Sequence, residues 1–271
     1  MTKSVGGIVV VVAAICAIPT AAETLLASKG GNSVVKVLTP GSAKVLAAKY
    51  MEFVGTVSLI VTRDVTGDQK RIIFDTGMPA QRGAICKALH ELDLKPSDVT
   101  HVIVSHRHFD HTSNMGMFGN AKQLWKSFVQ GKTMNFDVKF TDGALPLDPN
   151  VRVLKTPGHE SDDDVSAVVS NVENVLPAAA DGSPKLATVA LVGDLVNSER
   201  DVLGNVEKKS NAVDKTAPAY KKLEKIVASL TKIVCDEEAD CIVPGHGDLF
   251  KVTDEMRNQL GCGAASPQTN N

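Results

Sequence analysis

Hydrophobic residues fall along this chain in short runs, each bounded by Gly, Pro, Asp or Asn. Runs of β-branched and aliphatic residues of this length are typical of strands. They occupy residues 34–38, 54–62, 71–74, 151–154, 165–169 and 187–192. The polar segment 64–68 separates the second run from the third, which predicts that these two strands pair across a turn.

Two segments have helical spacing instead. Residues 82–92 place Ile85, Leu89 and Leu92 on one face, and residues 217–234 repeat apolar positions at intervals of three and four. Two shorter strands are predicted at 100–105 and 241–243, whereas 121–138 has no clear period. Strands that alternate with helices indicate an α/β fold.

The densest group of polar side chains follows the strand at 100–105. His106 and His108 stand two residues apart, so an extended backbone points both imidazoles the same way. Asp110 and His111 follow where the chain turns, and a short helix through Asn114 and Met115 would face them to a second point. Three histidines and an aspartate within six residues predict a metal site, with zinc the best-suited ion and iron or manganese as alternatives.

Four other strands also end in polar residues beside glycine. These residues are Asp75, His159, Asp194 and His246. Loops at one edge of a sheet are where functional side chains gather, so we expect these residues to meet the first group. His90 and His101 lie inside the predicted helix and at a strand start, and we interpret them as structural.

Residues 1–22 have the pattern of a signal peptide. Lys3 precedes an apolar run at 5–18, and Pro19 and small residues lead to a cleavage position near Ala22. An uncleaved signal anchor is the alternative. The expected organisation is a leader at 1–22, one domain at 23–260 and a flexible tail at 261–271, with the mature protein secreted or in the secretory pathway.

The cysteines and the net charge bear on two further expectations, disulfide pairing and nucleic-acid binding. Without Cys16, the cysteines are Cys86, Cys235, Cys241 and Cys262, which allow three pairings. Cys235 and Cys241 bracket an acidic loop and could bridge, and free buried thiols are equally compatible. A net charge of -2 and 4% aromatic residues argue against a stable nucleic-acid complex.

The order and spacing of the ligand-type residues resemble the motifs of the metallo-β-lactamase superfamily. The signature is His106-x-His108-x-Asp110-His111, then His159, Asp194 and His246. The resemblance implies an αβ/βα four-layer sandwich and a hydrolase with two divalent metal ions. It also implies that His106, His108 and His159 hold the first ion, that Asp110, His111 and His246 hold the second, and that Asp194 bridges them. Asp110 would orient the attacking water as a catalytic residue, and Asp75 would orient a ligand histidine from behind.

Beyond the ligands, the chain is similar to one branch of that superfamily, through residues 114–118, 164–169, 193–201 and 243–247. The branch is described as homodimeric, zinc-dependent endoribonucleases of the cytosol and nucleus that act on histone pre-mRNA. The predicted leader disagrees with that location. We therefore keep two alternatives to an RNA substrate: a secreted hydrolase of a small ester, lactone, thioester or lactam, and a metal-binding protein without turnover. No membrane association is expected beyond the signal peptide.

Overall fold

The computed structural model describes residues 31–63, 66–125, 127–130, 133–135, 139–178 and 182–263. The predicted leader at 1–22, and residues 264–271 of the predicted tail, lie outside these ranges. Among the described helices, none combines the length and the apolar character needed to cross a membrane.

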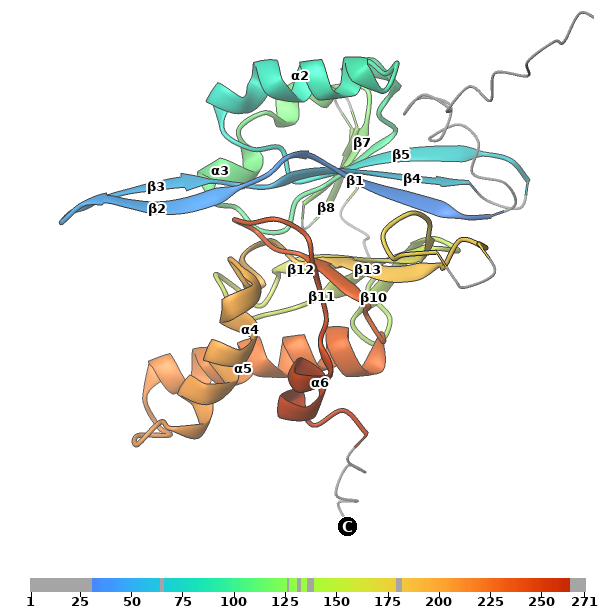
Figure 1. Cartoon of the computed structure of the whole chain (residues 1–271). Coiled ribbons are helices and arrows are strands. Elements are labelled where there is room, and N and C mark those ends of the chain that lie inside the picture. The colour runs from blue at the N-terminus through green and yellow to red at the C-terminus, as the bar shows by residue number, and fades with distance from the viewer. Residues whose placement is uncertain are drawn as a thin grey trace, which may run out of the picture.

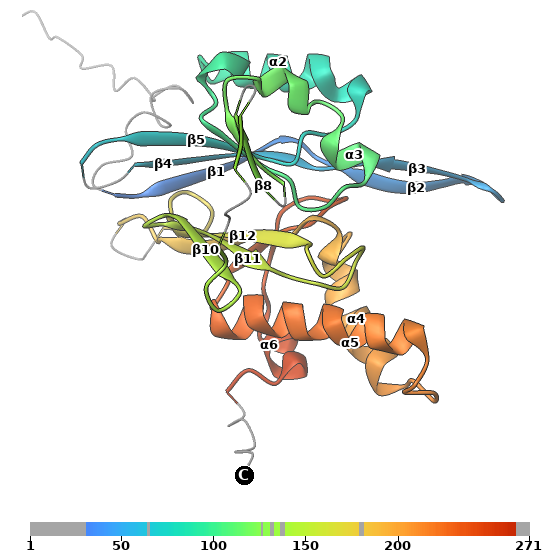
Figure 2. The same cartoon turned by 180° about the vertical axis from the view of Figure 1, so that it is seen from behind.

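The described chain forms four layers, helix on sheet on sheet on helix (Figure 1). The first half supplies one sheet and its covering helices, and the second half supplies the other pair of layers, as the reverse view confirms (Figure 2). This arrangement is the predicted αβ/βα sandwich. Hydrogen bonding links the two halves where β1 meets β12, through the parallel pair Ser33 and Val172.

In the first half, the main sheet is ordered β1-β4-β5-β6-β7-β8-β9, and β2 and β3 form a separate hairpin. The strands are β1 (Ser33–Thr39), β2 (Ser42–Ala47), β3 (Tyr50–Val54), β4 (Val57–Arg63), β5 (Gln69–Phe74), β6 (His101–Ile103), β7 (Lys122–Trp125), β8 (Ser127–Gln130) and β9 (Thr133–Asn135). The helices are α2 (Arg82–Glu91) and α3 (Phe109–Thr112), with short 3-10 turns η1 (Pro79–Gln81), η2 (Pro96–Asp98) and η3 (Met115–Phe118).

In the second half, the order is β15-β14-β13-β12, with β11 beside β12 and β10 beside β11. The strands are β10 (Ala144–Asp148), β11 (Val151–Lys155), β12 (Val165–Val172), β13 (Ala187–Leu191), β14 (Cys241–Val243) and β15 (Phe250–Lys251). The helical segments are the 3-10 turn η4 (Gly193–Leu195), α4 (Glu199–Ser210), α5 (Pro218–Thr231), the π-helix η5 (Lys232–Asp236) and α6 (Asp254–Leu260).

Three apolar clusters hold these layers together. One fills the space between the sheets and includes Ile60, Ile103 and Leu191, each fully buried. Another packs α2 on the first sheet through Ile85 and Leu89, and a third packs α4, α5 and α6 on the second sheet. Full burial of each such side chain contributes about 1.5–3 kcal/mol, so the ligand loops stand on a rigid base.

Most predicted elements are confirmed, but two boundaries are wrong. The predicted strand at 54–62 is split: Val54 ends β3, paired with Ser42, and β4 begins at Val57. The break follows because the Val54 carbonyl accepts from His246 Nδ1 and Thr56 N donates to the Gly245 carbonyl. The predicted helix through Asn114 ends at Thr112. Asn114 leaves helical geometry, and its side-chain amide donates to the Thr76 and Met78 carbonyls instead.

The open question of cysteine pairing is also resolved in the structure. Cys235 is bonded to Cys262, with Cα atoms 5.1 Å apart, so the suggested Cys235–Cys241 bridge is wrong. Cys241 lies in β14 as a buried thiol, and Cys86 is an exposed thiol on α2. Because Cys262 follows α6, the bridge fastens this last helix to the π-helical end of α5.

Candidate metal centre

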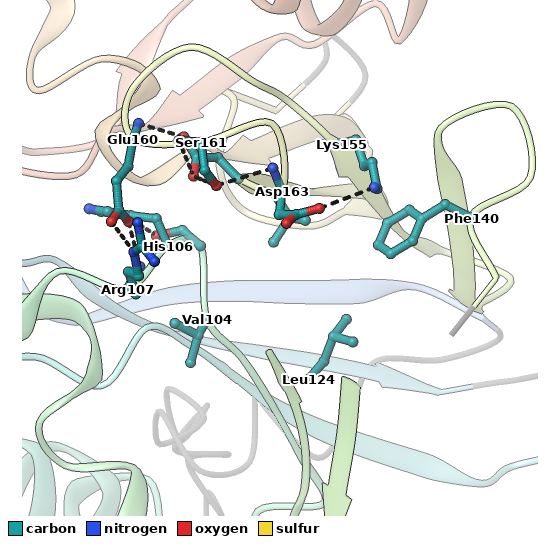
Figure 3. A pocket seen from close by; sticks show the side chains of 12 residues that line it. Val104, His106, Arg107, Leu124, Phe140, Lys155, Glu160, Ser161 and Asp163 are labelled. Carbon is teal, nitrogen blue, oxygen red and sulfur yellow. Dashed lines mark hydrogen bonds and ion pairs between the residues drawn. The ribbon is translucent and has the colours of Figure 1, made fainter. Parts of the chain in front are cut away.

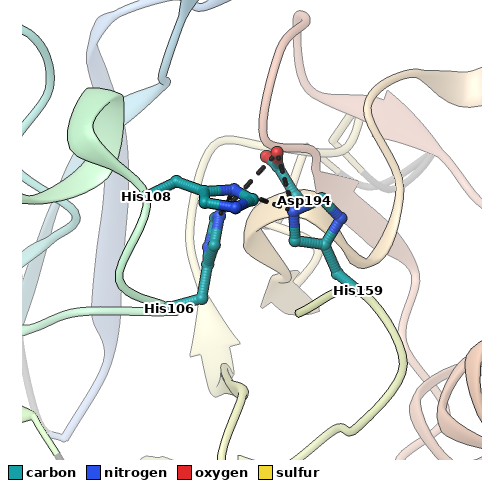
Figure 4. A group of neighbouring side chains, drawn as sticks. All are labelled: His106, His108, His159 and Asp194. Atoms are coloured by element: carbon teal, nitrogen blue, oxygen red, sulfur yellow. Dashed lines mark hydrogen bonds and ion pairs between the residues drawn. The ribbon is translucent and has the colours of Figure 1, made fainter. Parts of the chain in front are cut away.

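Seven side chains from four loops meet at one edge of the sandwich, and they form two groups. His106, His108, His159 and Asp194 make one group, and Asp110, His111 and His246 make the other. Within each group, one potential ligand atom per residue lies within 4.8 Å of all the others. All seven predicted ligands therefore come together, and the first group is seen in Figure 4.

In the first group, three imidazoles face one another. His106 Nε2 lies 2.9 Å from His108 Nδ1, and His159 Nε2 lies 3.0 Å from the same His108 atom. His106 and His108 share a side as the spacing predicted. His159 comes from the turn after β11 and crosses from the second half of the chain.

In the second group, α3 turns Asp110 and His111 toward a different point. His111 Nε2 lies 3.4 Å from Asp110 Oδ2, and His246 Nε2 lies 3.5 Å from that oxygen. His246 enters from the turn after β14, so this group also joins both halves of the chain. The short helix performs the reorientation that the sequence predicted, although it is only four residues long.

Asp194 contacts both groups. Its Oδ1 lies 3.1 Å from His111 Nε2, whereas its Oδ2 lies 3.1 Å from His246 Nε2 and 3.5 Å from His159 Nε2. Gly245 makes this position possible, since a Cβ there would overlap Asp194 Oδ1. One carboxylate therefore stands between the two groups, as a bridging ligand would.

The second nitrogen of three histidines is held by the protein. His106 Nδ1 lies 2.9 Å from Ser105 Oγ, His111 Nδ1 lies 2.8 Å from Asp75 Oδ2, and His246 Nδ1 lies 2.9 Å from the Val54 carbonyl oxygen. A histidine that donates from Nδ1 keeps a lone pair on Nε2, the atom that faces its group. These contacts fix both the tautomer and the direction of each ring.

Asp75 supports both groups from behind. Besides His111, its carboxylate accepts from Ser105 N at 2.7 Å and from Ser105 Oγ at 2.8 Å. Ser105 in turn accepts from His106, so one carboxylate orients ligands on both sides. Asp75 has a φ of 57°, a left-handed conformation that is unusual for a residue with a side chain and that is found where function holds the backbone.

The His159 turn is fastened to the His106 loop by a charged pair behind the ligands (Figure 3). Glu160 accepts from the Arg107 backbone nitrogen at 3.1 Å and from Arg107 Nε. Asp164 accepts from the backbone nitrogens of Glu160 and Ser161, which closes the turn. Two ligand loops that are far apart in sequence therefore move as one unit.

Burial and charge set the protonation of these groups without a metal. Burial lowers the pKa of His106 to about 4 and also lowers the pKa of His159. Burial opposes the charge on His111, but Asp75, Asp110 and Asp194 raise its pKa well above the usual value. Burial alone would raise the pKa of Asp194, yet the adjacent imidazoles of His111 and His246 hold it far below its usual range. The Asp194 carboxylate is therefore ionised at neutral pH.

The donor set fits metal ions. Asp110 Oδ2, His111 Nε2 and Asp194 Oδ1 are buried and have no hydrogen-bond partner among the described residues, although they face one another. An unpartnered buried polar atom costs about 1–3 kcal/mol, so three together in a well-packed protein indicate a missing ligand. Imidazole and carboxylate donors at this density are the set that zinc, iron or manganese takes.

A cavity of about 430 Å³ opens over five of the candidate ligands. Phe53 from the β2–β3 hairpin and Phe109 from α3 line it, together with Asn197. The sequence analysis missed these three residues. An exposed aromatic residue inside the ligand motif, as Phe109 is, was the available signal, whereas Phe53 reaches the cavity only through the hairpin.

The two histidines interpreted as structural lie outside both groups. His90 is exposed on α2, and His101 is half-buried at the start of β6.

Comparison with known proteins agrees with this geometry. Residues 51–166 match the family model of the metallo-beta-lactamase superfamily. Metallo-beta-lactamase domain-containing protein 1 of Rattus norvegicus is 30% identical over 262 residues, covering 88% of this chain and 94% of that protein. Its counterpart in Mus musculus is 29% identical over 255 residues, covering 85% of this chain and 88% of that protein.

Among solved structures, a Thermotoga maritima protein assigned provisionally as a metallo-beta-lactamase superposes with a TM-score of 0.52 at 18% identity. The match covers 82% of this chain and 100% of that one, and it supports the fold. With the matched family model, the similarity to whole relatives and the convergence of seven ligand-type side chains, this chain belongs to the metallo-beta-lactamase superfamily and is a metal-dependent hydrolase.

Proposed function

We propose that the centre holds two zinc ions and that the protein hydrolyses a small ester, lactone, thioester or lactam. His106, His108 and His159 would hold one ion, and Asp110, His111 and His246 the other, with Asp194 shared. The observation that carries the proposal is the set of unpartnered buried donor atoms on Asp110, His111 and Asp194, between two ligand groups.

When bound, two such ions lower the pKa of water toward ~7 and polarise the group to be cleaved. The side chains then have separate tasks. Burial alone would raise the pKa of Asp110, but the adjacent His111 and His246 together lower it, so its carboxylate is available to accept a proton from water. The same oxygen can return that proton to the leaving group.

The cavity over the ligands supports a small substrate. Its volume of about 430 Å³ lies in the range of small-molecule sites, and Phe53 and Phe109 give it apolar walls. Asn197 Oδ1 is buried without a hydrogen-bond partner among the described residues, so it offers one polar contact to orient the substrate. The net charge of -2 gives no general attraction to RNA.

A substrate panel on purified protein of measured metal content tests the proposal. Thioesters, lactones, simple esters and a cephalosporin are each assayed with and without chelator, beside a single-stranded RNA. We expect about two metal ions per chain and chelator-sensitive turnover of at least one small substrate. Less than one ion per chain would refute the two-metal centre, and full metal content without any turnover would favour a metal-binding protein.

Endoribonuclease activity is the second candidate. It is supported by similarity to metallo-beta-lactamase domain-containing protein 1 over most of the chain, and by the resemblance of residues around the ligands to that branch. The same panel decides between them. Fast, chelator-sensitive RNA cleavage with no small-molecule turnover would replace the first candidate.

We also propose that the protein is secreted and that its mature chain begins near Glu23. The Cys235–Cys262 bridge supports this, since disulfides persist in oxidising compartments. Mass spectrometry of the N-terminus of protein expressed in eukaryotic cells tests it, and a retained Met1 on cytosolic protein would contradict it. The homodimer implied by the resemblance stays a prediction.

A further inference from the structure

A second cavity shares His159 with the substrate cavity. It has a volume of about 340 Å³, and His159 lines both. One wall is the turn at residues 158–162, and the other wall is the start of α5, with Pro218, Lys221, Lys222 and Lys225. Any molecule that reaches from the metal centre past His159 enters this space.

The lysines stand on one stripe of α5. Positions 218, 221, 222 and 225 follow the spacing that places side chains on a single helix face. Val227 and Leu230 on another face are buried in the core. The lysine face is therefore set by the packing of the helix and points at the His159 turn.

The two walls are locked together. Gly158 has a φ of 144°, and a Cβ there would lie 2.6 Å from Ile226 Cγ1 and 2.8 Å from the Ile226 backbone nitrogen. Only glycine permits this approach. Ser229 Oγ donates to the Pro157 carbonyl at 2.9 Å, a second tie between the turn and α5. The cavity between them is thus preformed.

The charges around the cavity do not cancel. Both carboxylate oxygens of Glu160 accept hydrogen bonds from Arg107, and Lys225 Nζ lies 2.6 Å from Asp162 Oδ1. Lys221 and Lys222 form no ion pair with any residue that the structure describes. Two free ammonium groups therefore face a cavity beside the metal centre of a chain with net charge -2.

We propose that Lys221 and Lys222 form an anion subsite that binds a carboxylate or phosphate group of the substrate, remote from the bond that is cleaved. The inference rests on the proposed small-molecule hydrolase and narrows its substrate to an anionic one. A compact cavity with two ammonium donors suits one such group, since ammonium groups bind these oxygens as point charges.

Binding can be measured without turnover. We propose titrating the metal-loaded protein with inorganic phosphate and, separately, acetate, while following backbone amide signals of residues 158–162 and 219–225 by NMR. We expect saturable shifts in both segments. Lys221→Ala/Lys222→Ala should weaken binding at least about fivefold, because charge-assisted hydrogen bonds are lost. Tighter binding of phosphate than acetate would indicate a phosphate-bearing substrate, and the reverse a carboxylate.

Two single variants serve as controls. Lys95→Ala removes an exposed lysine that follows α2 in the chain, and should leave anion binding unchanged. Helix α2 belongs to the outer layer opposite α5 (Figure 1). Lys225→Ala removes a lysine that is already paired and should have a smaller effect than the double variant. Equal affinity of the double variant and the unaltered protein would overturn the proposal. So would shifts that do not saturate, or tighter binding of a single-stranded RNA that the double variant loses.

A kinetic arm separates this inference from the proposed function. Two esters that differ only in a remote carboxylate are compared, and the double variant should raise KM at least about fivefold for the anionic ester alone, with kcat unchanged. If no ester is hydrolysed, the proposed function fails while the NMR titration still decides the subsite. If the double variant raises KM equally for both esters, the anion subsite is refuted while the proposed hydrolase function is retained.

Discussion

The two ligand groups of the metal centre differ in how they meet solvent. In the second group, the His111 side chain is 0% exposed and that of His246 is 1% exposed. In the first group, His108 is exposed and the His159 side chain is 23% exposed. Asp194 lies between them. His111 is therefore part of the protein interior, whereas His108 and His159 reach solvent. Both groups line the substrate cavity, the second through Asp110 and His246.

The two groups also differ in which protein atoms hold the far side of each histidine ring. His111 is anchored by the Asp75 carboxylate and His246 by a backbone carbonyl, so each buried ring has a partner on its far side. In the first group only His106 has such an anchor, and it is a neutral hydroxyl. A charged group can be buried only beside an opposite charge. Stability should therefore depend more on the buried His111 than on the exposed His108.

Removing the residue that both groups share should have the largest effect. Asp194→Ala is expected to lower turnover at least about a thousandfold, because neither group keeps its common carboxylate. Metal content should fall as well, which elemental analysis measures. His90→Ala on α2 is the control and should change neither quantity. Equal losses in both variants would show that the ligand assignment is wrong.

The contrast between the groups is tested by one histidine from each. His111→Ala should lower the free energy of unfolding by about 3–5 kcal/mol, because it leaves Asp75 buried without its partner. His108→Ala should cost less than about 1 kcal/mol, since that ring is exposed. Urea denaturation of both metal-depleted variants measures the difference. Similar costs would mean that burial does not distinguish the groups.

The anchors behind the ligands provide a finer comparison. Asp75→Asn should weaken metal binding about 10–100-fold while leaving every ligand in place, because it removes the charge that orients His111. Ser105→Ala should weaken it less, since the hydroxyl is neutral and orients only His106. Competition with a chromogenic chelator gives both affinities. A larger loss for Ser105→Ala would reverse the proposed importance of the two groups.

His101 provides a contrast to His111. Both histidines are at least partly buried, but His101 has two lysines nearby, whereas His111 is surrounded by acids. Burial, then the charges of Lys122 and Lys70, lowers the pKa of His101 to about 4. The unfolded state therefore binds more protons below pH ~6.5, and stability should fall between pH ~6.5 and ~4. Because the ring is partly exposed, we expect a loss of about 1–2 kcal/mol.

The control for this effect is His101→Gln, which should make the fall in stability over that pH range correspondingly smaller. Thermal denaturation at a series of pH values compares the two proteins. An identical pH dependence would show that His101 is not responsible.

Local pattern was enough to predict the scaffold of the centre. Strands at β1, β5, β11, β12 and β13, and the helices α2 and α5, were found because each has an apolar period that its own residues define. The convergence of ligands was predictable for a related reason. Each ligand lies in a loop or short helix that follows a strand, and such loops gather at one edge of a sheet.

Other features depend on residues that are distant in sequence. The break after Val54 comes from contacts with Gly245 and His246, and the pairing of Cys235 with Cys262 depends on where α6 packs. The hairpin β2–β3 has largely exposed strands and so has no one-sided apolar pattern to reveal it.

The sequence by itself determined the layered α/β fold and the identity of the ligand-type side chains, because strand and helix periods and strand-end loops are local properties. No local pattern grouped the ligands; the family resemblance implied the two groups and the shared Asp194. Only the tertiary structure gives the distances between these side chains and shows that Lys221 and Lys222 line a cavity beside His159. Those relations depend on the distance between segments that lie about 50 to 140 residues apart, which packing of the two halves sets. No local pattern contains that distance.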